Sequence, residues 1–324
     1  MDGRKWMLFV AALIAAGCHT ERAAAPPPPA GMDSVQVPGG VLYIPTGFHV
    51  NVFANENGPR FLALAPDGTV YVALTGAGQV VRLLDLNHDG VAESSAVVAS
   101  GLTNPHGLAF RRDTLYVAEE SGVKRYDPGV ASPVQVVSNL PCCGIGHSSR
   151  SIAFGPDNMM YVSIGSSSNI SPETDTLRAA VLRYNLDGTG GRVFARGLRN
   201  SVGIAFNPTT GALWATNNDR DDIGGSDVAM TDSLPPERIN ILTLGGNYGW
   251  PVKEGTFLFA VNPNDPHTLS SGYVYLNSPG YPPNLIDPIA EYDHTDDGGK
   301  SEMRAAIIGG FLYEGEKLKE LKGH

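Results

Sequence analysis

A hairpin that recurs four times is the feature that most limits what this chain can fold into. Each copy has a short apolar strand, a turn of the "PDG" type and a second strand, and three copies continue into a strand with an outward arginine ("VVRLLD", "VKRYD", "VLRYN"). The alanines of the first strands are 46, 44 and 52 residues apart: Ala63, Ala109, Ala153 and Ala205. Short strands that repeat at a long period are typical of a β-propeller, whereas a β-sandwich does not repeat its own sequence. The sequence therefore predicts an all-β propeller.

The length of the repeat predicts the number of blades. A propeller domain over residues 37–324 accommodates about six blades of about 48 residues each. Residues 251–300 break the rhythm with Pro/Asn-rich sequence, and a last strand-like run starts at Ala305. Because open sheet edges are a liability, we expect a six-bladed propeller whose last blade is incomplete at the C-terminus, or a sequence that is a fragment.

The N-terminus has the pattern of an export signal. Residues 1–18 combine a basic start, an apolar run and small residues before Cys18, which is similar to a bacterial lipobox. Residues 19–36 are rich in Pro and Ala and are predicted to be an extended linker. We expect an exported protein, periplasmic or on the cell surface, whose membrane contact is a lipid anchor at Cys18. Simple signal cleavage that leaves a soluble protein is the alternative.

The charge balance limits the partners. The formal net charge is −10, and no Lys/Arg run stands out beyond the N-terminal region. This argues against nucleic-acid binding. No later segment is long and apolar enough to span a bilayer.

Polar residues directly precede the repeated first strands. These residues are His106, His147, Arg150, Arg199 and Asn200. In a propeller such positions converge on one end of the central channel, and buried convergence of polar groups is costly without a ligand. The sequence therefore predicts a polar site there. The alternatives are that the histidines and the Arg-Asn pair are turn or capping residues, and that Arg150 pairs with a carboxylate between blades.

Three segments carry a resemblance to a known family. They are "GHSSRSIAFGPDNMMYVSIG", "GLRNSVGIAFNP" and "ERINILTLGGNYGWP". In combination they resemble the glucose/sorbosone dehydrogenase family, from about Pro45 to the C-terminal end. The resemblance implies a six-bladed propeller that uses pyrroloquinoline quinone (PQQ) and Ca²⁺ to oxidise an aldose or related sugar. Electrons would pass to an external acceptor, a cytochrome or a quinone.

The resemblance also implies roles for individual residues. His147 matches the general base, and a histidine suits that role because its pKa is close to working pH. Arg199 and Asn200 match cofactor-binding residues, with which we group Arg150. The backbone carbonyls of Asp219 and Arg220 match calcium ligands. Asp221 and Asp222 would add carboxylates, and Trp250 in "NYGWP" is expected to pack rather than stack on a substrate.

A second calcium motif is present. The segment "DLNHDGVAE" places Asp85, Asn87 and Asp89 in the first half of a calcium-loop pattern. The closing acid of that pattern would fall at Ala96, which has no ligating side chain. The sequence thus leaves two readings open, a single ion held by three residues or a tight turn between outer strands.

Adjacent cysteines precede His147 in the sequence. Export implies an oxidising compartment, so Cys142 and Cys143 either form a vicinal disulfide or remain free thiols. A metal site from this pair alone is not expected, because no second cysteine pair completes it.

Three functions remain open at this point. The first is a PQQ- and calcium-dependent sugar dehydrogenase, which the His and Arg residues at the strand starts favour. The second is a calcium-dependent lactonase-type hydrolase, which would use Asn, Asp and Glu side chains from several blades. The third is a non-catalytic binding propeller.

Overall fold

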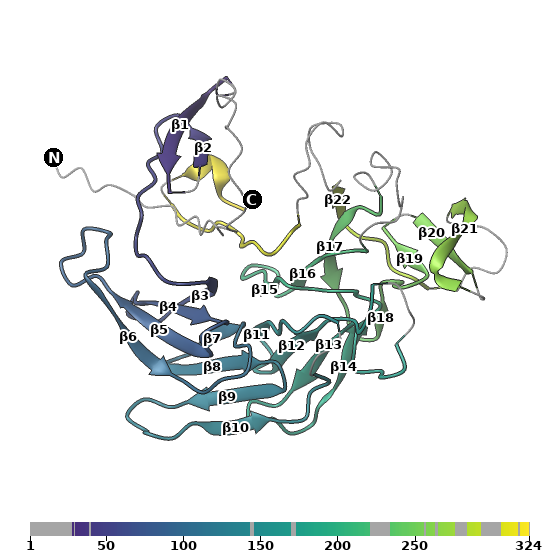
Figure 1. Cartoon of the computed structure of the whole chain (residues 1–324), viewed down its shortest axis with the longest axis horizontal. Coiled ribbons are helices and arrows are strands. Elements are labelled where there is room, and N and C mark those ends of the chain that lie inside the picture. Colours follow the sequence, from purple (N-terminus) through teal and green to yellow (C-terminus); the bar gives the residue numbers. More distant parts are fainter. Residues whose placement is uncertain are drawn as a thin grey trace. The chain divides into compact units, whose positions relative to one another are not determined.

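The computed structural model describes residues 28, 30–38, 40–142, 146–169, 173–220, 234–255, 257–262, 265–275, 284–292, 306–316 and 318–323 (Figure 1). They form two compact units, one up to Gly101 and one from Leu102 onward. Regular structure in these residues is almost entirely β, with one 3₁₀ turn, η1 (Lys319–Leu321). None of their helical segments has the length and apolarity needed to cross a membrane. The predicted all-β class is confirmed.

The first unit contains a hairpin and a four-stranded antiparallel sheet of order β3-β4-β5-β6. Its strands are β1 (Met32–Val37), β2 (Gly40–Pro45), β3 (Pro59–Leu64), β4 (Val70–Leu74), β5 (Gln79–Leu84) and β6 (Ser94–Ala99). The β3–β4 turn follows from its residues, because Asp67 accepts a hydrogen bond from Thr69 N (2.9 Å) and Gly68 has a φ of +87°.

Strand β1 corrects the predicted linker over residues 19–36. The strand begins at Met32 and pairs with β2, so the linker prediction is wrong for residues 32–36. Its sequence alternates polar and β-branched residues, and Val35 and Val37 are half-buried while their neighbours are exposed. Such alternation is typical of a strand with one covered face.

The second unit repeats the four-stranded sheet three times. Its first eleven strands are β7 (Leu108–Arg111), β8 (Thr114–Glu119), β9 (Gly122–Tyr126), β10 (Val134–Val137), β11 (Ile152–Phe154), β12 (Met160–Ile164), β13 (Ala180–Tyr184), β14 (Arg192–Arg196), β15 (Ile204–Phe206), β16 (Leu213–Asn217) and β17 (Glu237–Leu242). Strands β7–β10 and β11–β14 form antiparallel sheets in chain order, and β15–β17 begin a third.

The strands after β17 break this regularity, as the sequence predicts. They are β18 (Gly246–Asn247), β19 (Lys253–Glu254), β20 (Phe257–Asn262), β21 (Asp265–Tyr275) and β22 (Ala290–Tyr292). Strand β18 pairs in parallel with β14, and β19–β21 form a separate three-stranded sheet. Strand β22 then returns to pair with β17 as the fourth strand of the third sheet.

The repeated alanine occupies the same position in all four sheets. It lies opposite an aromatic residue of the second strand, in the pairs Ala63–Tyr71, Ala109–Tyr116, Ala153–Tyr161 and Ala205–Trp214. In three sheets that aromatic residue lies in turn opposite an arginine of the third strand, Arg82, Arg125 or Arg183. The sequence repeat is therefore a repeat of strand register, as expected for propeller blades.

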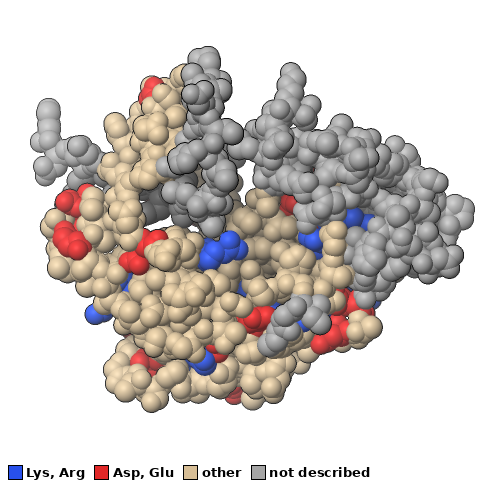
Figure 2. Space-filling model, in the orientation of Figure 1, with Lys and Arg blue, Asp and Glu red and all other residues tan. Residues whose placement is uncertain are grey.

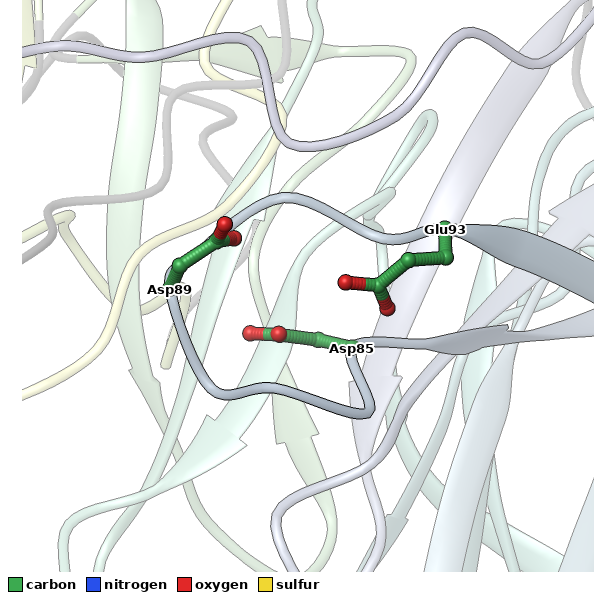
Figure 3. Close-up of side chains that lie close together, drawn as sticks. All are labelled: Asp85, Asp89 and Glu93. Atoms are coloured by element: carbon green, nitrogen blue, oxygen red, sulfur yellow. The ribbon is translucent and has the colours of Figure 1, made fainter.

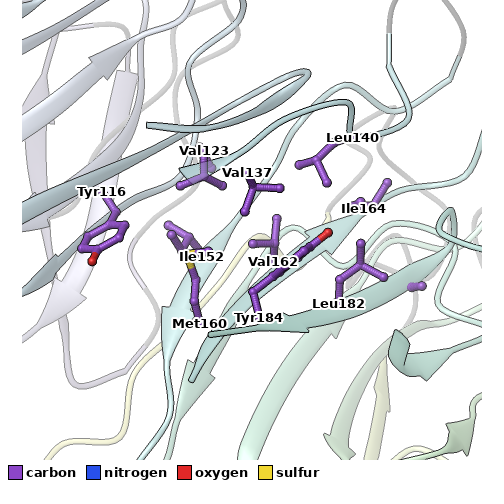
Figure 4. Packing of buried hydrophobic residues seen from close by; sticks show 12 residues of the cluster. Tyr116, Val123, Val137, Leu140, Ile152, Met160, Val162, Ile164, Leu182 and Tyr184 are labelled. Atoms are coloured by element: carbon purple, nitrogen blue, oxygen red, sulfur yellow. The ribbon is translucent and has the colours of Figure 1, made fainter. Parts of the chain in front are cut away.

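Apolar faces of successive sheets pack on one another in the second unit. Met160, Val162 and Ile164 project from one face of β12 into a cluster with Val123 and Val137 of the preceding sheet (Figure 4). Tyr161 projects from the other face, into a cluster with residues of β15 and β16, and its ring meets that of Phe206 edge-on at 5.0 Å. Alternate residues of one strand thus serve two cores.

Candidate functional site

The loops before β7, β11 and β15 are joined to one another. These three strands lie side by side in the second unit. Gly107 N donates a hydrogen bond to Arg150 O (2.8 Å), and Ser151 Oγ donates one to Val202 O. The structure thus brings together the loops that carry the predicted site residues.

His147 is held by the segment that follows β12. Its backbone N donates to Ser166 O at 3.0 Å. Its ring Nδ1 lies 3.0 Å from Ser166 Oγ and 3.2 Å from Ser166 O. The side chain is half-buried. These contacts therefore fix the orientation of the imidazole.

Asn200 lies next to His147, with Gly165 between them. A Cβ atom on Gly165 would lie 2.5 Å from His147 Cβ and 2.8 Å from Asn200 Oδ1, so only glycine fits this position. Asn200 N donates to Asn217 Oδ1 at 3.1 Å. The loop before β15 is therefore fixed against the end of β16.

Arg199 is buried and donates to neutral oxygens. Its Nε and Nη2 donate to Asn169 O (3.0 Å) and Asn169 Oδ1 (2.7 Å). Its Nη1 donates to Asn218 O (3.2 Å) and Asp219 O (2.6 Å). The charge of Arg199 also acts on the nearby carboxylate of Asp219, and a guanidinium is a group that binds anionic ligands.

Arg150 has a different environment from the one expected for a cofactor ligand. The side chain is fully buried, and its three nitrogens donate to the backbone carbonyls of Glu120, His147, Ser149 and Pro141. Burial lowers the pKa of Arg150 to about 10, so the side chain stays charged at neutral pH. Arg150 therefore links neighbouring loops, and its contact with a cofactor stays a prediction. Its hydrogen bonds go to carbonyls, and the nearby carboxylate of Glu120 favours its charged form.

Asp219 and Arg220 lie at the beginning of the loop after β16, and both are buried. The carboxylate of Asp219 accepts from Arg238 Nε and Nη2 (2.6 Å for Nη2) and from Asn217 Nδ2 (2.7 Å). Arg220 Nε donates to Glu254 Oε2, and its Nη2 donates to Pro251 O (2.9 Å). Both side chains are thus occupied within the protein, which leaves the backbone carbonyls as the candidate metal ligands. Asp221 and Asp222 lie outside the described residues.

Sequence reasoning missed the charged residues beneath this loop. Arg238 and Glu254 are fully buried, and together with Asp219 and Arg220 they form a set of paired charges. The sequence did contain a signal for Arg238. This arginine lies on the same face of β17 as the buried Leu242, and a charged residue at such an inward position indicates a buried ion pair. Ser166 was also missed, since a serine after a strand is ordinary in sequence.

The acidic loop between β5 and β6 contains Asp85, Asp89 and Glu93. Their side chains lie close together, with ligand atoms within 4.8 Å of one another (Figure 3). Asn87 has another role, because its Oδ1 accepts from Asp89 N at 2.8 Å. Asp85 Oδ2 accepts from Gly90 N at 3.0 Å. Hydrogen bonds within the loop support the tight turn, and a calcium ion at Asp85, Asn87 and Asp89 stays a prediction.

The cysteines are partly described. Cys142 is disulfide-bonded. Its partner is one of the other two cysteines, Cys18 and Cys143, and both lie outside the described residues. The pairing with Cys143 therefore stays a prediction. Cys142 O accepts from Arg178 Nη2 at 3.3 Å, so the segment is also held through its backbone.

Two further residues weighed from the sequence are buried. His106 is 2 % exposed, and its backbone N donates to Ala118 O (3.0 Å). Trp250 is 5 % exposed, and its backbone N donates to Gly197 O (3.1 Å). Trp250 packs in the interior, as expected. His106 was predicted to be a turn residue, and the structure shows it as a buried residue of a loop.

Charge on the drawn face is mixed. Figure 2 shows basic and acidic side chains scattered among neutral ones, without a continuous basic surface over the described residues. This distribution does not favour a polyanionic partner.

Comparison with solved structures defines the class of protein as a β-propeller. The chain resembles the calcium structure of a Trichoderma reesei carbohydrate-active enzyme of family AA12, at 24 % identity and a TM-score of 0.56. That match covers 73 % of this chain and 68 % of the other. The PQQ-bound aldose sugar dehydrogenase of Streptomyces coelicolor matches at 21 % identity and a TM-score of 0.54, over 83 % of this chain and 74 % of the other. These likenesses establish the fold.

The chain belongs to the TrAA12-like family, whose model matches residues 42–259. A PQQ-dependent sugar dehydrogenase of Hypocrea jecorina is 28 % identical over 229 residues, which are 60 % of this chain and 52 % of the relative. Quinoprotein glucose dehydrogenase B of Acinetobacter calcoaceticus is 23 % identical over 286 residues, 70 % of this chain and 54 % of the relative. The chain spans about half the length of these relatives. The relationship to PQQ-dependent sugar dehydrogenases that the three sequence segments predicted is confirmed.

Proposed function

We propose that the protein oxidises an aldose or related sugar with PQQ and Ca²⁺ and passes the electrons to an external cytochrome or quinone. The observation that carries the proposal is the meeting of an oriented imidazole, an amide and a buried guanidinium on adjacent loops, at His147, Asn200 and Arg199. Family membership and the activities named for the relatives support it.

The donor set fits such a cofactor. Arg199 is a buried guanidinium next to Asn200, and PQQ is an anion at neutral pH. Calcium prefers oxygen ligands, and the carbonyls of Asp219 and Arg220 are oxygen donors on one short segment. Asp219 O already accepts from Arg199 Nη1, and a carbonyl oxygen has a second lone pair for a cation. The two residues would hold the metal with backbone atoms, and Asn200 would hold the cofactor with its amide.

The chain's own residues would contribute binding, orientation and proton transfer. When bound, PQQ supplies a carbonyl carbon that accepts the hydride of the sugar C–H bond. His147 would take the proton of the sugar hydroxyl at Nε2, which becomes the imidazolium N–H while the C–O bond becomes a carbonyl. Arg199 would stabilise negative charge that develops beside it, at a buried position where water screens little.

The test is a titration of the full chain with PQQ, with and without Ca²⁺, followed by absorbance. We expect saturable, calcium-dependent binding and dye-linked oxidation of aldoses. His147→Gln should bind PQQ as the wild type does and lose at least about 100-fold in turnover. Unchanged turnover in that variant would contradict the assignment of the base, and calcium-independent or absent PQQ binding would contradict the cofactor.

The alternative functions have less support. A calcium-dependent lactonase-type hydrolase would need carboxylate and amide side chains around the metal, and the carboxylate of Asp219 is bound by Arg238. A non-catalytic binding propeller is the conclusion if PQQ binds and no sugar is oxidised.

We further propose export and a lipid anchor at Cys18, which rest on the sequence pattern of residues 1–18.

A further inference from the structure

We propose that Ser166 is a positioning residue that fixes His147 in the Nδ1–H tautomer and thereby makes Nε2 the proton acceptor. The inference deepens the proposed function and rests on it, because it concerns how the base is prepared. Ser166 follows β12 and Gly165, and its side chain is fully buried.

The position of the Ser166 proton follows from its second contact. Ser166 Oγ lies 2.6 Å from Ser168 O, a carbonyl oxygen that has no proton to give. At this distance the hydroxyl proton must lie between the two oxygens, so Ser166 Oγ donates to Ser168 O. The hydroxyl has one proton, and Oγ is therefore an acceptor toward its other neighbours.

His147 Nδ1 consequently faces two acceptors. They are Ser166 Oγ at 3.0 Å and Ser166 O at 3.2 Å. A lone pair on Nδ1 would oppose lone pairs on both oxygens, whereas an N–H group satisfies them. In neutral imidazole one ring nitrogen is protonated and the other is an acceptor. Nδ1–H therefore leaves the lone pair on Nε2, and a neutral hydroxyl rather than a carboxylate sets the tautomer.

The backbone of Ser166 links the same groups. Its N donates to Arg199 O at 2.7 Å, and its carbonyl oxygen also accepts from His147 N at 3.0 Å. Ser166 thus connects the loop of the proposed base to the loop of the proposed cofactor-binding arginine. Its hydroxyl can be removed without removing these backbone bonds, which makes the side-chain contribution separable.

The experiment reads the tautomer directly and needs no cofactor. The full chain is labelled with ¹⁵N-histidine, and long-range ¹H–¹⁵N spectra are recorded at about pH 8, where histidine is neutral. The signals of His147 are those lost in His147→Gln. We expect the wild type to give the Nδ1–H pattern and Ser166→Ala to gain the Nε2–H form, because the closer acceptor is gone.

A matched control is available on β12, the strand that precedes Ser166. Ser163 is 3 % exposed, and its Oγ accepts from Ser151 N at 3.1 Å. Ser163→Ala should leave the His147 signals unchanged. An Nε2–H pattern in the wild type overturns the proposal even if Ser166→Ala fails to fold, and an unchanged tautomer in Ser166→Ala overturns it as well.

Turnover separates this proposal from the proposed function. With PQQ and Ca²⁺ bound, Ser166→Ala should lose about 10- to 100-fold in kcat with little change in KM. If the tautomer shifts and the sugar oxidation of the wild type is absent, the positioning role stands and the proposed function fails. If the wild type is active and the tautomer of Ser166→Ala stays the same, the positioning role fails alone.

Discussion

Two arginines of similar sequence context have different roles in this protein. Arg150 and Arg199 each precede the first strand of a blade. Arg150 donates to carbonyls of four residues within the protein, among them His147 O at 2.9 Å. Arg199 lies beside Asn200 and the candidate metal-binding carbonyls. At the scale of the residue, the role of an arginine depends on which acceptors surround its guanidinium group.

The burial of Arg150 leads to a stability prediction. Arg150→Met would leave several buried carbonyls without a donor, so we expect a loss of about 3 to 5 kcal/mol in the free energy of unfolding. Arg183→Met is a matched control, because Arg183 is only partly buried and pairs with the partly exposed Asp157 at 2.9 Å, so its loss should be clearly smaller. Urea denaturation measures both, and equal losses would contradict the structural role of Arg150.

Glu254 gives a prediction for the pH dependence of stability. Burial raises the pKa of this carboxyl from 4.5 to about 7. Between these values the folded state holds a proton that the unfolded state has released, so the free energy of unfolding falls as pH rises. In the metal-free protein with EDTA, we expect the wild type to lose up to about 3 kcal/mol relative to Glu254→Gln across that range. A difference that stays constant with pH, measured by urea denaturation, would contradict it.

At the scale of the element, the repeated register determines where the loops end. Each first strand pairs its alanine with an aromatic residue, so corresponding residues of successive sheets occupy corresponding places. Strands β7, β11 and β15 then lie side by side, and their leading loops form hydrogen bonds to one another. A small residue in the first strand and a large one in the second also let the sheets pack face to face.

The ion pair between Asp219 and Arg238 joins β17 to the loop after β16. Both side chains are buried, and the guanidinium also donates to Tyr248 O at 2.7 Å. Either Asp219→Asn or Arg238→Met alone leaves its partner buried and unpaired, and should cost about 3 to 5 kcal/mol. The double variant should cost clearly less than both single losses together, with a coupling of about 2 kcal/mol in a double-mutant cycle. Additive losses in urea denaturation would show that the pair is not coupled.

At the scale of the whole molecule, the N-terminal pattern predicts where the protein is found. Cys18→Ser removes the thiol that would carry the lipid, so the protein should move from the membrane pellet to the soluble fraction of a cell lysate. Fractionation followed by immunoblotting measures this. A wild-type protein that is already soluble would contradict the lipid anchor and favour simple signal cleavage.

Much of the fold could be predicted from local sequence. The repeated hairpins predict strands, turns and the blade period, because alternation and turn residues act over a few neighbours. The beginning of β1 and the return of β22 to pair with β17 were not predictable, since both depend on distant partners. The site was predicted in part: His147, Arg199 and Asn200 gather as expected, whereas the role of Ser166 depends on distances to residues in another loop.

The sequence by itself determined the all-β class, the four-fold recurrence of one register and the residue types at the strand starts. These properties are local, because strand periodicity and turn formation depend on residues that are consecutive in the chain. Only the tertiary structure decided that Arg150 is an internal link, that Asp219 is neutralised by Arg238, and that a serine hydroxyl holds the ring of His147. Hydrogen bonding and burial join residues far apart in the chain, and a hydroxyl or guanidinium takes its role from the acceptors that folding places around it.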